Sequence, residues 1–278
     1  PDDSSTWLSS LDIINPALWW AHHKRAVWGF GVASNRIDWD SVIAAANACD
    51  ENVACLNGSV EDRYRISAEI LEDEDRDRVC QSILGTMMGA EVEDGAGWKV
   101  FAGVYEAPTE TLDESWLVGD VDYEGWPSRA GTFNTVRGTH INGARRWLVQ
   151  PYPEVQLADL LASDQGVASY ETLDLPYVAS HTNAQRCAAI AARQSQRKPL
   201  KIDVILPNYL RATIGKRFFV DLPSLRIPAG TVMVVQARGR SEAASADARQ
   251  VFTLTLLTDG ADVYTAPTLS DLLTDESD

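Results

Sequence analysis

Five acidic residues lie close together in a run whose side chains could bind a metal. The run holds Glu72, Asp73, Glu74, Asp75 and Asp77. Carboxylate oxygens suit Ca²⁺, but an EF-hand loop also needs a glycine at its sharp turn and a terminal glutamate, and the run has neither. Acidic side chains also stabilise the positive N-terminal end of a helix. The run therefore predicts a solvated helix start and not a calcium site.

Four cysteines and four histidines are the other residues that could bind a metal or act in catalysis. They are Cys49, Cys55, Cys80 and Cys187, and His22, His23, His140 and His181. The cysteines are too few and too scattered for a disulfide scaffold, and the interval from Cys49 to Cys55 is not a CxxC motif, so buried reduced thiols are favoured. Adjacent His22 and His23 would point about 100° apart on a helix and could not share one metal. We predict no metal site, no cofactor, no catalytic residue and no enzymatic activity.

Two catalytic arrangements nevertheless stay open, because catalytic partners can converge from distant positions. One is a pair of Cys187 with a histidine, and the other is a pair of carboxylates in a cleft lined by some of the nine tryptophans. The motifs GxGxxG, GxxxxGK[ST] and GxSxG do not occur. Nucleotide binding and α/β-hydrolase chemistry therefore lack their usual local signatures.

The charge of the chain is distributed unevenly. The net charge of −16 comes from 40 acidic and 24 basic residues. Residues 1–112 hold 20 acidic and 8 basic side chains, whereas residues 113–266 hold 16 of each. The second region could form a basic patch from Arg137, Arg145, Arg146, Arg193, Arg197, Lys198, Lys201, Lys216 and Arg217. Because acidic residues are equally frequent there, surface ion pairing is expected in place of nucleic-acid binding.

The first region predicts a small α+β domain. Asn15 and Asp38 are capping residues in front of two helical patterns, and a third helix follows the acidic run and ends before Gly89. Residues 63–71 alternate like a half-buried strand. Residues 90–92 and 98–104 flank a glycine-containing turn and predict a hairpin.

The second region predicts a mostly-β domain with one packed helix. Short β-branched or alternating runs, separated by proline and glycine turns, suggest a barrel or strongly curved sheet. They cover residues 132–140, 200–206, 216–220, 231–237 and 250–257. Thr182 and Gln185 form a capping-box pattern in front of a helix whose small-residue face contains Ala184, Cys187, Ala188 and Ala191. We predict that this helix lies outside the barrel.

The fold class expected is therefore α+β with three consecutive parts. They are an α+β domain over 1–112, a barrel domain over 113–266, and an acidic tail or linker over 267–278. The chain starts at Pro1 and ends in a polar run, so we expect a fragment of a longer protein or a processed product. No stretch approaches the roughly 18 uninterrupted apolar residues of a membrane helix, and no membrane span or secretion signal is expected.

Motifs that begin with Asn15-Pro16-Ala17 and include Phe133-Asn134-Thr135-Val136-Arg137-Gly138 follow one another in order along residues 15–258. In this order they resemble the central tail-tip proteins of long-tailed phages, the group typified by the host-specificity (tip attachment) protein J of lambda-like phages. The most specific match joins Asn15-Pro16-Ala17, Trp28-Gly29-Phe30-Gly31, Ile37-Asp38-Trp39 and the segment from Ala44 to Glu51. Further matches are Arg63-Tyr64, Ala102-Gly103-Val104-Tyr105-Glu106-Ala107-Pro108, Phe133-Asn134-Thr135-Val136-Arg137-Gly138, Leu173-Asp174-Leu175-Pro176-Tyr177-Val178 and Ala184-Gln185-Arg186. The sequence departs from the family pattern at Trp19-Trp20-Ala21-His22-His23 and at Cys55.

The resemblance implies a structural baseplate hub at the tail tip of a virion. Three copies would close the distal tail tube, with barrel domains in the tube wall and smaller α+β domains around it. The partners implied are a homotrimer, the distal tail protein, the tape measure protein, and tail fibre or receptor-binding domains. DNA would pass during ejection without specific binding, and assembly would take place in the host cytoplasm. Receptor binding in the family resides in additional C-terminal domains, so no receptor site is assigned here.

Two alternatives to the hub remain open from the sequence. One is a cell-wall or carbohydrate-cleaving enzyme of the same tail apparatus, which would need two carboxylates about 5–9.5 Å apart in a tryptophan-lined cleft. The other is a binding module of a secretion or contractile machine related to phage tails, because such machines reuse the hub architecture.

Overall fold

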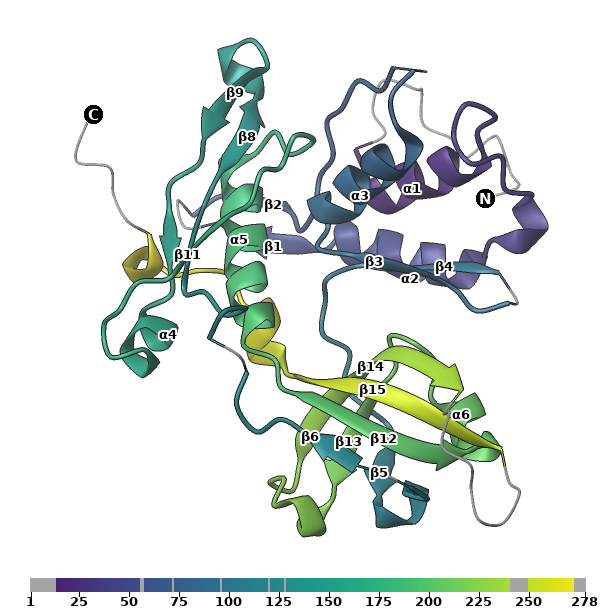
Figure 1. Cartoon of the computed structure of the whole chain (residues 1–278). Coiled ribbons are helices and arrows are strands. Elements are labelled where there is room, and N and C mark those ends of the chain that lie inside the picture. Colours follow the sequence, from purple (N-terminus) through teal and green to yellow (C-terminus); the bar gives the residue numbers. More distant parts are fainter. Residues whose placement is uncertain are drawn as a thin grey trace. The chain divides into compact units, whose positions relative to one another are not determined.

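The computed structural model divides the chain into two compact units, described separately below (Figure 1). Unit 1 comprises Pro1–Val104, Asn134–Ala191 and Ala266–Asp278, and unit 2 comprises Tyr105–Phe133 and Ala192–Thr265. The structure describes residues 14–272 apart from residues 56–57, 72, 96, 120, 128 and 241–249. Within these residues, no helix has the length and apolar character needed to cross a bilayer.

The three helices expected in the first region are present in unit 1. They are α1 (Pro16–Arg25), α2 (Trp39–Cys49) and α3 (Arg76–Thr86). The side chain of Asn15 accepts hydrogen bonds from the backbone N–H groups at the start of α1, and Asp38 and Asp75 cap α2 and α3 in the same way. Each cap satisfies donors that the first helical turn leaves unpaired. The capping signals in the sequence are thus confirmed.

Two short hairpins accompany these helices in unit 1. Strand β1 (Asn52–Ala54) pairs antiparallel with β2 (Val60–Asp62). Strand β3 (Ala90–Glu93) pairs antiparallel with β4 (Trp98–Phe101), as the sequence predicted.

The prediction of a strand over residues 63–71 is wrong. This segment is irregular and its backbone joins no ladder. Its N–H groups instead donate to separate segments, Tyr64 to the carbonyl of Cys49 and Ile66 to that of Ile14. The alternating pattern arises because the side chains of Tyr64 and Ile66 are buried while Arg65 is exposed. Alternating burial alone does not require a neighbouring strand.

Residues 134–156 form a long two-stranded ribbon in unit 1. Strand β7 (Thr135–Arg137) pairs antiparallel with β10 (Val155–Gln156) and parallel with β11 (Tyr170–Thr172). The ribbon continues as β8 (Thr139–Asn142), which pairs antiparallel with β9 (Leu148–Pro151). Helix α4 (Ala158–Ser163) follows the ribbon. The run at 132–140, expected to be a barrel strand, therefore belongs to this ribbon.

Helix α5 (His181–Ser195) is the helix predicted around Cys187, but its cap differs from the prediction. Ser180, not Thr182, lies at the N-terminal end, where its carbonyl accepts from the N–H of Ala184 at 3.0 Å. Every residue from Asn183 to Ile190 is buried. The small side chains of this segment allow such close packing on all sides of the helix.

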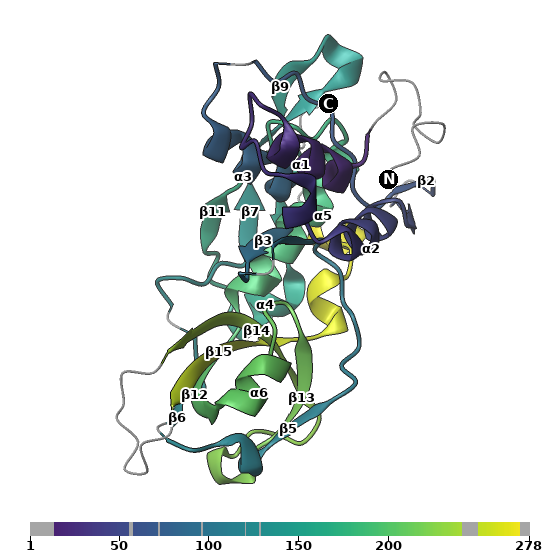
Figure 2. The same cartoon turned by 90° about the vertical axis from the view of Figure 1, so that its right-hand side faces the viewer.

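Unit 2 is built around one curled sheet of six strands (Figure 2). The order is β5 (Thr111–Asp113), β13 (Arg217–Asp221), β14 (Thr231–Arg240), β15 (Val251–Asp259), β12 (Pro199–Ile205) and β6 (Val121–Tyr123). Neighbours are antiparallel except β5, which runs parallel to β13. A bulge lies between Val235 and Ala237, and bulges increase local bending. Four of the predicted strand runs are confirmed here, and the sheet is a half-barrel.

One face of the half-barrel buries a continuous apolar core. Its members are Leu112, Trp116, Leu200, Ile202, Val204, Ala212, Phe218, Val220, Leu222, Ile227, Met233, Val235, Leu254 and Leu256. The rings of Trp116 and Phe218 meet edge to face at 5.2 Å. Helix α6 (Leu206–Arg211) packs beside the sheet, where Tyr209 stacks on Phe252 at 4.3 Å. No described residue of α5 belongs to this core, in line with the prediction that α5 lies outside the barrel.

The compact units differ from the three consecutive parts expected over 1–112, 113–266 and 267–278. Residues 134–191 group with the N-terminal segment, so both units are discontinuous in sequence. The segment expected as a tail also packs within unit 1, because Leu272 bridges to Val155 and the Asp271 carboxylate accepts from the N–H of Ala158. Residues 273–278 lie outside the described part.

The neighbouring residues Phe218 and Phe219 provide a matched test of the half-barrel core. Phe218 is fully buried, whereas Phe219 lies on the opposite face and is 39% exposed. We expect Phe218→Ala to lower the free energy of unfolding by about 3–5 kcal/mol, through lost burial and a cavity. Phe219→Ala should cost less than about 1 kcal/mol. Urea denaturation measures both values, and equal losses would contradict the assigned strand orientation.

Candidate assembly site

The cysteines are free thiols in the structure. Cys49, Cys80 and Cys187 are buried, and burial raises the pKa of each of these thiols to about 12. Cys187 donates weakly to the carbonyl of Thr86 and to the side chain of Asn183, and no histidine among the described residues hydrogen-bonds to it. A thiol with a raised pKa is a poor nucleophile at neutral pH. The expectation of buried thiols holds for these three residues, and Cys55 is half-buried.

The histidines do not form a common site. His23 is buried, donates from Nε2 to the carbonyl of Arg76 at 3.0 Å, and packs against the rings of Trp28 and Phe30. Burial lowers the pKa of His23 and of His140. His181 is exposed at the start of α5. Within residues that the structure describes, no group of three or more metal-binding side chains converges.

The acidic run begins α3, as predicted. Asp75 caps the helix and Asp77 lies in its first turn, while Glu72 falls outside the described residues. Glu74 accepts from the N–H of Leu71 and from the hydroxyl of Tyr177.

Three carboxylates with little solvent exposure each accept a hydrogen bond or form an ion pair. Asp203 accepts from Thr253 at 2.8 Å, and Asp271 accepts from the N–H of Thr268 at 2.8 Å. Asp259 is fully buried and forms ion pairs with Arg197 at 2.6 Å and Arg217 at 2.7 Å. Each of these groups ties strands or turns together, which accounts for its burial.

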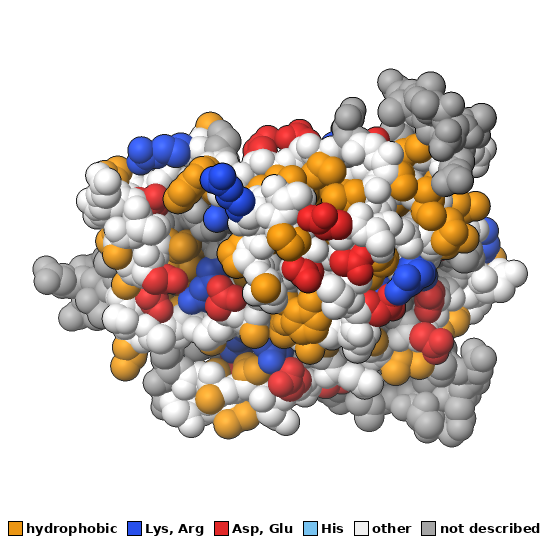
Figure 3. All heavy atoms as spheres, turned by 90° about the horizontal axis from the view of Figure 1, so that it is seen from below, with side chains coloured by type: hydrophobic (Ala, Val, Ile, Leu, Met, Phe, Trp, Pro, Cys, Tyr) orange, Lys and Arg blue, Asp and Glu red, His pale blue; other side chains and the backbone are white. Residues whose placement is uncertain are grey.

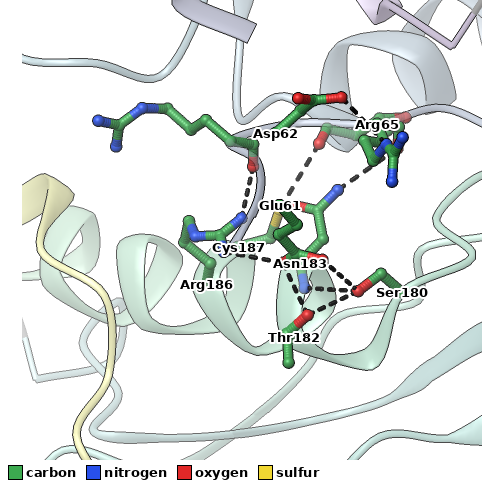
Figure 4. A network of polar contacts seen from close by, with 10 residues as sticks. Glu61, Asp62, Arg65, Ser180, Thr182, Asn183, Arg186 and Cys187 are labelled. Carbon is green, nitrogen blue, oxygen red and sulfur yellow. Dashed lines mark hydrogen bonds and ion pairs between the residues drawn. The ribbon is translucent and has the colours of Figure 1, made fainter. Parts of the chain in front are cut away.

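A buried ion pair connects α5 to strand β2 (Figure 4). Arg186 is 3% exposed and its Nη2 lies 2.9 Å from Oε1 of Glu61, while its Nη1 donates to the carbonyl of Arg63. Thr182 donates to Oε1 of Glu61 at 2.7 Å, and Ser180 donates to Oε2 at 2.9 Å. The Glu61 carboxylate is thus saturated with donors from the first turns of α5.

These contacts change the acidity of Glu61. Burial alone raises the pKa of its carboxyl, but the hydrogen bonds from Thr182, Arg186 and Ser180 outweigh burial, so the net shift is downward. A carboxyl with a lowered pKa stays ionised at neutral pH and stabilises the folded state.

A second buried cation, Lys24, was not singled out by the sequence analysis. Its side chain is fully buried, with Nζ 2.9 Å from Oε1 of Glu91. The ammonium lies 3.9 Å from the ring centre of Phe30 and 3.8 Å from that of Trp98. Cation–π contacts of this kind partly replace lost hydration. The cluster joins α1 to the β3–β4 hairpin and has a structural role.

The half-barrel offers the surface best suited to assembly. Its two edge strands, β5 and β6, are three residues long, and each presents an exposed aspartate, Asp113 or Asp122. Short charged edges resist indiscriminate strand pairing. The face opposite the core carries two apolar cross-strand pairs, Phe219 with Val232 and Val234 with Leu257. These four residues are called the outer face below. The ion-paired Arg217 and Asp259 complete the same two rows across β13, β14 and β15.

The basic residues predicted as a patch are dispersed over both units. Arg197 and Arg217 pair with Asp259, and Lys216 pairs with Glu110. Arg145 and Arg146 are exposed next to β9. On the face seen in Figure 3, basic, acidic and apolar side chains are interspersed. The prediction of ion pairing is confirmed for three of the nine residues in this set.

The Glu61 network predicts a pH-dependent contribution to stability. Glu61→Gln should lower the free energy of unfolding by about 3 kcal/mol at pH 7, because it leaves a buried guanidinium without its counter-charge. Since the folded pKa lies below the unfolded value of 4.5, the stabilisation is present above about pH 4.5 and is lost as the pH falls through the folded pKa. Denaturation at several pH values should therefore show the difference shrinking in acid.

A matched control for that variant is Glu51→Gln. Glu51 pairs with Arg63 at 2.7 Å, but its side chain is 57% exposed. Exposed pairs contribute about 0–1 kcal/mol. Equal effects of the two substitutions, or a Glu61 effect independent of pH, would contradict the network's role.

The buried thiols predict selective reactivity. At pH 8 a thiol-specific disulfide reagent should titrate only Cys55 in the native chain, because the other three cysteines are buried. All four should react after unfolding in urea. Rapid native reaction of more than one thiol would contradict the burial described here.

Comparison of the sequence with protein-family models and with curated proteins gives no match. Among solved structures, a chain in the virion of a native gene transfer agent particle aligns over 76% of this chain and 44% of its own, with 15% identity and a TM-score of 0.50. The 43 kDa tail protein of prophage MuSo2 from Shewanella oneidensis aligns over 72% of this chain and 57% of its own, with 11% identity and a TM-score of 0.44. The prophage tail protein gp18 from Listeria monocytogenes EGD-e aligns over 71% of this chain and 56% of its own, with 11% identity and a TM-score of 0.41. The chain thus spans about half the length of these proteins, and it shares its fold with the gene-transfer-agent virion chain.

Proposed function

We propose that this chain is a structural component of a phage tail tip. In this role it forms part of the baseplate hub that closes the distal tail tube, links the tube to receptor-binding parts and lets DNA pass during ejection. The observation that carries the proposal is the fold shared over 76% of the chain with a virion protein. The ordered motif resemblance to tail-tip proteins over residues 15–258 supports the same role independently.

The half-barrel supports a homotrimer as the assembled form. A curled sheet with two open edges can contribute one segment of a tube wall, which other copies complete. The outer face presents Phe219 at 39% exposure, and large apolar side chains on a flat sheet face favour contact with another protein. A head-to-tail contact of this kind closes a ring when the rotation between copies fits.

The charge of the chain supports passage of DNA without specific binding. A net charge of −16 repels phosphates at long range, and the mixed side chains seen in Figure 3 differ from the continuous basic stripe of a DNA reader. DNA would therefore slide past such a wall without being retained.

The partners follow from the same proposal. They are the distal tail protein, the tape measure protein, and tail fibre or receptor-binding domains. In this proposed role, the chain assembles in the host cytoplasm and lies at the tail tip of the virion. The geometry offers nothing that favours the cleaving enzyme as a second candidate, since the low-exposure carboxylates described above serve as structural partners.

The proposal predicts self-association of the purified chain. Light scattering coupled to size exclusion should approach three times the 30.5 kDa monomer mass as concentration rises. Phe219→Glu should shift the transition to at least tenfold higher concentration, because it places a charge on the outer face. Leu210→Glu is the matched control, since Leu210 lies on α6 and is 61% exposed. A wild-type chain that stays monomeric at every concentration would refute the proposed assembly.

A further inference from the structure

The ribbon formed by β7 to β10 is a basic island in an acidic chain. Residues 134–156 contain three basic residues, Arg137, Arg145 and Arg146, and one acidic residue, Glu154, whereas the whole chain carries a net charge of −16. Arg145 and Arg146 lie in the connection between β8 and β9, and both are exposed. The hairpin tip, defined here as residues 145–149, therefore combines positive charge with the apolar residues that follow.

The apolar residues of the hairpin tip are exposed to solvent on both faces of the ribbon. Trp147, Leu148 and Val149 are 60%, 59% and 63% exposed. Successive strand residues point to opposite faces, so the exposure of both Leu148 and Val149 means that neither face is packed there. Strand β9 pairs with β8 alone in the described sheets. The backbone of β8 is also bonded to residues 175 and 178, so the lack of packing is confined to the tip and β9.

The shape of the tip is specific and not that of a simple turn. Arg146 and Trp147 both adopt left-handed backbone conformations, with φ of 58° and 61°. The N–H of Trp147 donates to the carbonyl of Asn142 at 3.0 Å and closes the connection. Tryptophan and arginine are the residues most often responsible for binding energy at protein interfaces. The tip thus has the composition of an interface centre.

The chain itself carries a surface of opposite charge. Residues 69–71 and 73–77, called the acidic segment below, contain five exposed acidic residues and one exposed basic residue, Arg76. The acidic residues are Glu69, Asp73, Glu74, Asp75 and Asp77. Leu71 in the same segment is 56% exposed. Glu69 and Asp73 form no ion pair with any residue that the structure describes. An apolar side chain surrounded by carboxylates complements a tip made of Trp147, Leu148 and two arginines.

We propose that the hairpin tip of one copy docks on the acidic segment of a second copy. The inference deepens the proposed function and rests on it, because it names a contact that would hold neighbouring copies together. The two surfaces differ, so the contact is head-to-tail, and repetition of such a contact can close a ring. The acidic segment offers both carboxylates and the exposed Leu71 to the arginines and apolar residues of the tip, so a second copy is favoured as the occupant.

Charge reversal with rescue tests the contact. In the concentration series described above, Arg145→Glu with Arg146→Glu should raise the dissociation constant of the assembly at least tenfold. Adding Glu69→Lys and Asp73→Lys to the same chain should restore association to within about threefold, because each copy then carries both reversed surfaces. Arg129→Glu with Arg240→Glu is the matched control, since both arginines are exposed in unit 2. Circular dichroism confirms that each variant is folded.

Disulfide capture tests the same contact without relying on charge. In a Cys55→Ser background, one chain carries Arg146→Cys and another carries Asp73→Cys. Mild oxidation of the mixture should give a disulfide-linked dimer at least fivefold more abundant than in a mixture of Arg240→Cys and Asp73→Cys chains. Capture no greater than in this control would overturn the proposal.

The remaining outcomes separate the two proposals. If the wild type reaches the threefold mass and the reversed variant does so equally well, the hairpin contact is refuted and the hub assembly stands. If the wild type stays monomeric, both proposals are refuted.

Sedimentation with vesicles of phosphatidylcholine and phosphatidylglycerol tests whether the tip binds lipid instead. Binding that the arginine reversal abolishes, with self-association unchanged, would assign the tip to lipid and overturn docking on a second copy.

Discussion

The buried guanidinium of Arg186 sets the main constraint on unit 1. A buried charge is costly unless it is paired, and loss of one partner costs about 3–5 kcal/mol. Arg186 is paired with Glu61, which lies 125 positions earlier in the chain and also receives hydrogen bonds from Ser180 and Thr182. The start of α5 must therefore lie against β2. For this reason residues 134–191 belong with the N-terminal helices and not with the half-barrel.

Unit 2 is stabilised mainly by the burial of apolar side chains. The six strands enclose one contiguous core, and the Asp259 carboxylate holds Arg197 and Arg217 at the end of β15. Because the core is completed by residues of unit 2 alone, the sheet can keep short free edges and an apolar outer face. These are the features that a wall element needs when other copies complete the wall. The same features make the assembly proposal physically consistent.

Local signals in the sequence predicted much of the fold. The caps at Asn15 and Asp38, the β3–β4 hairpin and four strands of the half-barrel follow from side-chain types within a few residues. Pairings between distant residues could not be predicted in this way. The run at 132–140 has strand character in either unit, and only its partners β10 and β11 decide where it belongs. The α5 helix starts before Thr182, and Ser180 and Thr182 both donate to Glu61, a partner that the local capping pattern does not reveal.

The candidate surfaces were predictable to a smaller degree. The sequence indicated the acidic first region and the arginines at 145 and 146, but exposure of Trp147 and its neighbours depends on the ribbon standing without cover. The Lys24 cluster was missed, since Glu91 lies 67 positions away and no local motif connects them. Contacts between residues that are distant in the sequence could be identified only from the structure.

The proposed hub role requires copies of this chain to join into a ring. Electron microscopy of the purified chain at high concentration examines this assembly, because individual particles reveal both the number of copies and their symmetry. We expect threefold-symmetric particles with half-barrels in the wall. A field that contains only single chains, or paired chains with twofold symmetry, would rule the ring out.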